Sequence, residues 1–138
     1  MEGKAAAAED PGQRRSAPGE HRMMLLLRSD LKMGAGKLCA QAAHAAVAAY
    51  RAAECGSPGQ RDALQRWLRG GATKVALRVG SEEALRELQS AAEARAVVAA
   101  PVFDAGRTQV AAGTLTCVAL GPANESELGE LTGELKLF

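Results

Sequence analysis

The chain has 138 residues, a formal net charge of +1 and 47% hydrophobic residues, which is enough for one domain with one packed core. Only one Trp, one Tyr and two Phe are present, so we do not expect the aromatic platforms on which many nucleic-acid binders stack bases. Residues 22–107 hold 13 Lys and Arg against 8 Asp and Glu, a bias compatible with a phosphate-bearing partner but too weak to require one.

The chain begins with a segment of Ala, Gly, Pro and charged residues that contains no apolar run. We expect residues 1–21 to be a disordered leader and residues 22–138 to form the folded domain. No stretch of the chain is long and apolar enough to cross a bilayer. Four acidic residues in the leader also argue against a mitochondrial import signal, so we expect a cytoplasmic protein.

The predicted domain opens with RMMLLLR, residues 22–28, a continuous apolar run typical of a strand buried on both faces. A glycine-rich loop at 31–36 leads into a helix that ends near Arg51. Because this helix is apolar almost all round, we expect it to be buried. A turn at 55–59 precedes a second helix, in which Trp67 is expected to anchor the core.

The second half of the chain alternates strands and helices. A strand over 73–79 is followed by a helix capped by Ser81, a strand over 96–103, a strand over 116–121 and a helix capped by Asn124. The apolar tail at 134–138 is expected to dock on the sheet. The order β-α-α-β-α-β-β-α predicts an α/β fold with three α/β/α layers around a four-stranded, mostly parallel, mixed sheet.

This topology predicts where the polar loops meet. The first strand runs into the loop Asp30–Lys37, and the third strand runs into Asp104–Thr108. Strands that run in the same direction end at the same edge of a sheet, where open α/β sheets bind their ligands. We therefore expect the two loops to form one cleft.

Three polar residues interrupt the first helix. Lys37, Gln41 and His44 lie within about 60° on one face. Unpartnered burial of such groups costs several kcal/mol, so the face should meet a cleft, a partner side chain or a ligand. Together with Asp104 it offers an ammonium, an amide, an imidazole and a carboxylate for acid–base chemistry. The alternatives are a core histidine at position 44 and an Asx-type turn at Asp104–Thr108 with a surface arginine.

Two other kinds of chemistry fit the sequence less well. A P-loop would need Gly at position 31 and Ser or Thr at 38, but the chain has Leu31 and Leu38, which argues against nucleotide hydrolysis. The chain has no GxSxG motif, and Cys39 lies about 160° around the helix from Lys37 and its polar neighbours. A hydrolase built on these residues would activate water. No Cys/His ligand spacing is present, and we expect no metal and no cofactor.

The strings DLKMGAGKLCAQAAHAAVAAY, DAGRTQVAAGT, TCVALGPA and GELKLF closely resemble the peptidyl-tRNA hydrolases of the archaeal and eukaryotic type. The resemblance runs from about Met23 to Phe138. The first two of these strings together are highly specific for the family. It implies hydrolysis of the ester that joins a peptide to the terminal ribose of tRNA, with peptidyl-tRNA as the partner. A mitochondrial association and a homodimer are further options that the resemblance leaves open.

The resemblance also implies site residues. The family's functional positions match Lys37, Gln41, His44, Asp104 and Thr108, which form the expected catalytic set. Independently of the resemblance, backbone N–H groups at the glycine-rich helix start make an anion site, so Gly34 and Gly36, with Arg107, are the expected tRNA contacts. In this interpretation Asp104 and His44 activate and orient water, Lys37 and Thr108 contact the oxyanion or the ribose, and Arg107 contacts a phosphate. The alternative is a non-catalytic module that binds tRNA or a protein with the same surface.

Overall fold

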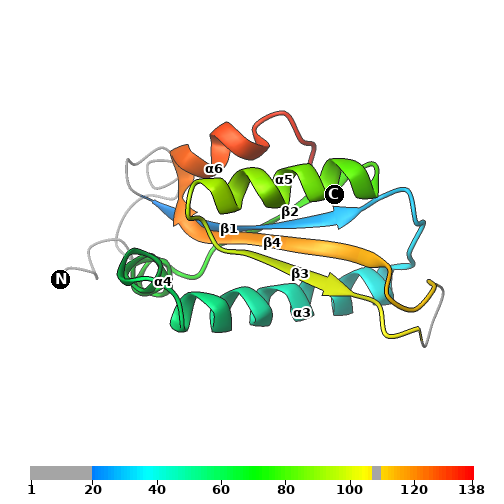
Figure 1. Ribbon diagram of the computed structural model, residues 1–138, viewed down its shortest axis with the longest axis horizontal. Helices are drawn as coiled ribbons and strands as arrows, with labels where there is room; N and C mark the ends of the chain where they lie inside the picture. Colours follow the sequence, from blue (N-terminus) through cyan, green and yellow to red (C-terminus); the bar gives the residue numbers. More distant parts are fainter. Residues whose placement is uncertain (1–19, 107–109) are drawn as a thin grey trace.

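The computed structural model describes residues 20–106 and 110–138, and Figure 1 shows how they are arranged. Its elements follow the predicted order: β1 (His21–Arg28), α3 (Ala35–Glu54), α4 (Pro58–Arg69), β2 (Lys74–Val79), α5 (Glu82–Ala94), β3 (Ala99–Phe103), β4 (Leu115–Asn124) and α6 (Glu125–Thr132). Most of the predicted leader lies outside the described residues.

The four strands form one sheet in the order β2-β1-β4-β3. The predicted four-stranded mixed sheet in three layers is confirmed. Its pairing differs from the mostly parallel arrangement that we expected, because β4 inserts antiparallel between β1 and β3, and only β1 and β2 pair in parallel. The strands β1, β2 and β3 nevertheless point in one direction, so β1 and β3 end at the same edge (Figure 1).

Both faces of the sheet are covered by helices. Side chains of β1 alternate between the faces: Met23 and Leu25 pack in the core beneath α3 and α4, whereas Met24 and Leu26 pack beneath α5 and α6. In Figure 1 these two helix pairs lie on opposite sides of the sheet. The buried strand predicted from the continuous apolar run is thereby confirmed.

The helix α3 is buried on one side only, so the expectation of burial all round is wrong. Val47 is 59% exposed, and Ala40 and Ala43 are exposed beside it. Alanine suits both a close helix–sheet contact and a solvent-facing surface, and the hydrophobic pattern therefore could not separate the two sides. The buried residues of α3 are spaced four apart: Gln41, Ala45, Ala49 and Ala53.

Two further predictions are confirmed at the sheet's borders. Trp67 is 4% exposed in the core, and its Nε1 donates to the Thr73 carbonyl at 2.8 Å. The C-terminal tail docks on β2, where the Phe138 amide donates to the Ala76 carbonyl at 3.0 Å. The tail covers an edge that would otherwise expose unpaired backbone groups. Within the described part of the chain, no helix is long and apolar enough to span a membrane.

Candidate active site

Lys37 and Asp104 meet at the edge where β1 and β3 end. Lys37 lies in the first turn of α3, and Asp104 directly follows β3. The Lys37 ammonium donates to Asp104 Oδ1 in an ion pair whose side chains are only 13% and 2% exposed. The predicted convergence of the two loops is therefore present, and it places opposite charges in nearly complete shelter from water.

Asp104 is held by its own loop as well. Its Oδ2 accepts a hydrogen bond from the Gly106 amide at 2.7 Å, so the Asx-type turn considered for this segment does form. The hydrogen bond from Lys37 holds the pKa of Asp104 below its usual value, and the Gly106 amide and the Lys37 charge add to this effect against the opposing effect of burial. Asp104 is thus a carboxylate at neutral pH.

Gln41 contacts the sheet one turn beyond Lys37. The Gln41 side chain donates from Nε2 to Thr116 Oγ1 at 2.6 Å, and the Thr116 hydroxyl donates to the Val102 carbonyl at 3.2 Å. Because a carbonyl can only accept, the hydroxyl must use its proton there and accept from Gln41. This chain of hydrogen bonds fixes the amide orientation and leaves Gln41 Oε1 as an acceptor for another group.

Thr116 was not predicted from the sequence, and a β-bulge explains why. Cys117 pairs with Val102 and Leu115 pairs with Phe103, which leaves Thr116 without an opposite residue on β3. The Thr116 hydroxyl reaches α3, and the next side chain, Cys117, packs in the core on the same face. A bulge of this kind turns a side chain out of the regular alternation, often beside an active site.

The start of α3 has the features of an anion site. Its N-cap is Gly34, which has no side chain, and its first turn contains no acidic residue. Gly34, Ala35 and Gly36 are exposed. Backbone N–H groups at such a helix start, together with the helix dipole, favour a phosphate or another anion.

The structure does not bring every predicted residue into this arrangement. His44 is exposed, and it forms no hydrogen bond or ion pair with residues 20–106 or 110–138. Arg107 and Thr108 lie outside the described residues, so their places in the site stay predictions. Within the same ranges, no cluster of three or more His, Cys, Asp or Glu side chains has an arrangement that would hold a metal ion.

Comparison with known proteins identifies the family. Residues 21–138 match the family model described as peptidyl-tRNA hydrolase PTH2. The chain belongs to this family. The PTH2 match includes all eight predicted site residues, whose individual roles stay predictions.

Members of the PTH2 family from distant organisms are similar to the chain. It is 42% identical over 122 residues to the probable peptidyl-tRNA hydrolase 2 of Schizosaccharomyces pombe. The aligned region covers 88% of this chain and 58% of that protein. It is 41% identical over 119 residues to the peptidyl-tRNA hydrolase of Methanopyrus kandleri, covering 86% of this chain and 98% of that protein. The human protein named peptidyl-tRNA hydrolase 2, mitochondrial, is 39% identical over 120 residues, covering 87% and 65%. The chain spans about three fifths of the length of its yeast and mammalian relatives.

Proposed function

We propose that this protein hydrolyses the ester bond between peptide and tRNA in peptidyl-tRNA, releasing free tRNA and peptide. Its PTH2 family membership supports the substrate. The observation that carries the chemistry is the sheltered ion pair of Lys37 and Asp104 at the shared edge of β1 and β3. Ester hydrolysis needs an acceptor that orients water and a positive charge for the developing oxyanion, and this pair supplies both.

The proposed roles follow from the contacts. Water attacks the ester carbonyl carbon, and the electron pair of the carbonyl bond moves to its oxygen. When the carbonyl re-forms, the bond to the ribose oxygen breaks, and a proton lost by the water ends on that oxygen as a ribose hydroxyl. Asp104 orients the water, because its lowered pKa makes it a reliable acceptor but a weak base. Lys37 stabilises the oxyanion. Gln41, whose amide is fixed by Thr116, offers Oε1 to the water or to a ribose hydroxyl.

The remaining predicted residues act on the substrate around this centre. His44 follows Lys37 by seven residues, which is about 10 Å along α3. Its exposed imidazole is accessible to bound substrate, and we propose that it accepts or donates a proton in the complex. We assign Thr108 to the ribose or the oxyanion, and Arg107 to a phosphate, with the amides around Gly34 and Gly36 as a second phosphate contact.

An assay with two readouts separates hydrolysis from the alternative of a non-catalytic tRNA- or protein-binding module. The protein is incubated with N-acetylated aminoacyl-tRNA in water labelled with heavy oxygen, and its binding to free tRNA is measured separately. We expect cleavage well above the spontaneous rate, with the label in the carboxylate of the released acyl group. Binding of tRNA without cleavage would favour the non-catalytic module.

We propose a cytoplasmic location for this protein, with a mitochondrial association as the alternative. The bovine and human relatives are named as mitochondrial proteins, and a mitochondrial location is therefore the alternative to test. Imaging of the full chain with a C-terminal fluorescent tag decides between the two compartments. The homodimer stays a prediction, which light scattering of the purified protein would test.

A further inference from the structure

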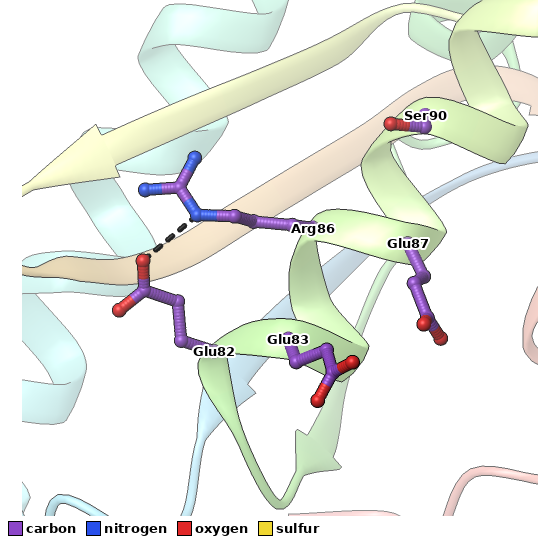
Figure 2. Close-up of a pocket in the computed structure, with 5 residues that line it drawn as sticks. All are labelled: Glu82, Glu83, Arg86, Glu87 and Ser90. Atoms are coloured by element: carbon purple, nitrogen blue, oxygen red, sulfur yellow. Dashed lines mark hydrogen bonds and ion pairs between the residues drawn. The ribbon is translucent and has the colours of Figure 1, made fainter.

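The two outer surfaces of the molecule carry opposite charge. The helices α5 and α6 cover one face with seven Glu and a single Arg. Figure 2 shows part of this surface, where Glu82 pairs with Arg86 at 2.8 Å, while Glu83 and Glu87 extend away from them. The helices α3 and α4 cover the other face with two acidic residues, Glu54 and Asp62, and five basic ones: Lys37, Arg51, Arg61, Arg66 and Arg69.

On α3 the polar groups form a line that begins at the candidate active site. Lys37, His44 and Arg51 follow one another at intervals of seven residues. Seven residues make almost two full turns, so each step shifts only about 20° around the helix. The line therefore runs along one side of α3, from the ion pair with Asp104 to the last turn.

The surface beside this line permits close approach of a polyanion. Its exposed side chains, Ala40, Ala43 and Val47, are small and uncharged. No acidic residue occurs on α3 before Glu54, its final residue. A phosphate backbone lying here would meet neither a like charge nor a long side chain.

Each of the two helices carries in its last turn an arginine that forms no direct ion pair in the described part of the chain. Arg51 lies in the last turn of α3 and Arg69 in the last turn of α4, and both are exposed. Neither forms a direct ion pair with an acidic group in the described ranges. Asp62 pairs with Arg66 at 2.8 Å, and the charge of Arg69 acts on Asp62 only from a longer distance. Arg51 and Arg69 are therefore available to bind phosphate.

We propose that the surface of α3 and α4 holds the body of the tRNA, with its acylated end at Lys37 and Asp104, and that α5 and α6 face away from it. This proposal rests on the proposed hydrolysis of peptidyl-tRNA. From Lys37 to Arg51 the helix rises about 21 Å. A nucleic-acid duplex carries about one charge per 1.7 Å of its axis, so roughly a dozen phosphates would lie over this distance. The net positive charge of this surface and its length favour an RNA duplex as the occupant.

Two double variants test this surface. Arg51→Gln with Arg69→Gln removes these two arginines from the last turns of α3 and α4. Arg86→Gln with Arg95→Gln is the control, which removes the same charge from the other side of the molecule. Both control residues are exposed and lie in ion pairs with glutamates of α5 or α6. Melting curves first establish that both variants are folded. Binding of free tRNA is then measured at several salt concentrations.

We expect the Arg51 and Arg69 variant to bind free tRNA roughly tenfold more weakly, with a salt slope smaller by about 1.4 to 1.8. The control variant should keep most of the parent's affinity for tRNA and the parent's full salt slope. Equal losses in both variants would show that only net charge matters. An unchanged slope in the Arg51 and Arg69 variant would also overturn the proposal.

A second substrate separates this proposal from the proposed function. N-acetyl-aminoacyl-adenosine has the same ester but no tRNA body. The Arg51 and Arg69 variant should show a raised KM for acylated tRNA with unchanged kcat, and it should hydrolyse the adenosine ester like the parent. A loss on both substrates would overturn the proposed surface. If the parent cleaves neither ester, the hydrolase proposal fails, and the binding experiment with free tRNA still decides whether this surface holds RNA.

Discussion

Replacing Thr116 with Val should weaken both the fold and the reaction. Valine preserves the shape of the side chain, but it removes the hydroxyl that accepts from Gln41 Nε2 at 2.6 Å and donates to Val102 at 3.2 Å. Gln41 is 4% exposed and Thr116 is fully buried, so water does not take the place of the lost partner. A buried polar group left without a partner costs about 1–3 kcal/mol. We expect the melting temperature to fall by roughly 3–12 °C.

A second substitution separates the structural effect from the chemical one. In Gln41→Leu with Thr116→Val both side chains are apolar, and no side-chain amide is left unsatisfied. The Val102 carbonyl loses the Thr116 donor in this variant and in Thr116→Val alike. Replacing both members of a buried hydrogen bond in this way is often nearly neutral for stability. The double variant should therefore be more stable than Thr116→Val alone, by about 1 kcal/mol or more. It should not regain turnover, because the Gln41 amide is absent.

The assay is a double-mutant cycle on four proteins. Urea unfolding gives the free energies of unfolding, and hydrolysis of N-acetylated aminoacyl-tRNA gives kcat/KM for each. Free energies that add within about 0.5 kcal/mol would refute the coupling between Gln41 and Thr116. Parental turnover in Gln41→Leu would remove Gln41 from the proposed active site, whatever the stabilities show.

Three further predictions concern burial and charge. Ala49→Asp should unfold the protein, because position 49 is fully buried and the new carboxylate has no partner, whereas Ala43→Asp on the exposed side should melt near the parent's temperature. Burial raises the pKa of the Cys117 thiol to about 12, so a thiol-specific reagent at about pH 8 should modify only the other two cysteines until denaturant is added. The pKa of Asp104 is lowered in the folded protein, so its contribution to stability is present above its unfolded pKa of about 4 and is lost as pH falls through the folded value. Urea unfolding from neutral to acidic pH should show the stability of the parent falling relative to Asp104→Asn only below about pH 4, and a constant difference would contradict the lowered pKa.

Much of the fold could be predicted because local signals agreed with the topology. The apolar run in β1 indicated burial on both faces, and the order of elements predicted that Lys37 and Asp104 would meet at one edge. That prediction needed only the common direction of β1 and β3. The prediction is therefore correct although β4 lies unexpectedly between these two strands. The position of β4 depends on pairing between strands that are distant in the sequence.

The features that escaped prediction depend on tertiary contacts. The exposed side of α3 could not be recognised, because Ala43 and Ala49 are the same residue in opposite environments. Thr116 lies in an apolar strand pattern with no local sign of a bulge, and only its pairing with β3 shows why it faces Gln41. The polar face predicted on the helix likewise divides into sheet-contacting residues and an exposed His44.

Lys37 and Asp104 are the two residues to which we assign the chemistry of the proposed ester hydrolysis. Single-turnover cleavage of N-acetylated aminoacyl-tRNA should be measured for the parent, Lys37→Met, Asp104→Asn and the remote control Arg86→Gln, each shown to be folded by its melting curve. We predict that both ion-pair variants lose about a hundredfold or more in rate while the control keeps the parent's rate. Parental rates in folded Lys37→Met and Asp104→Asn would contradict the account.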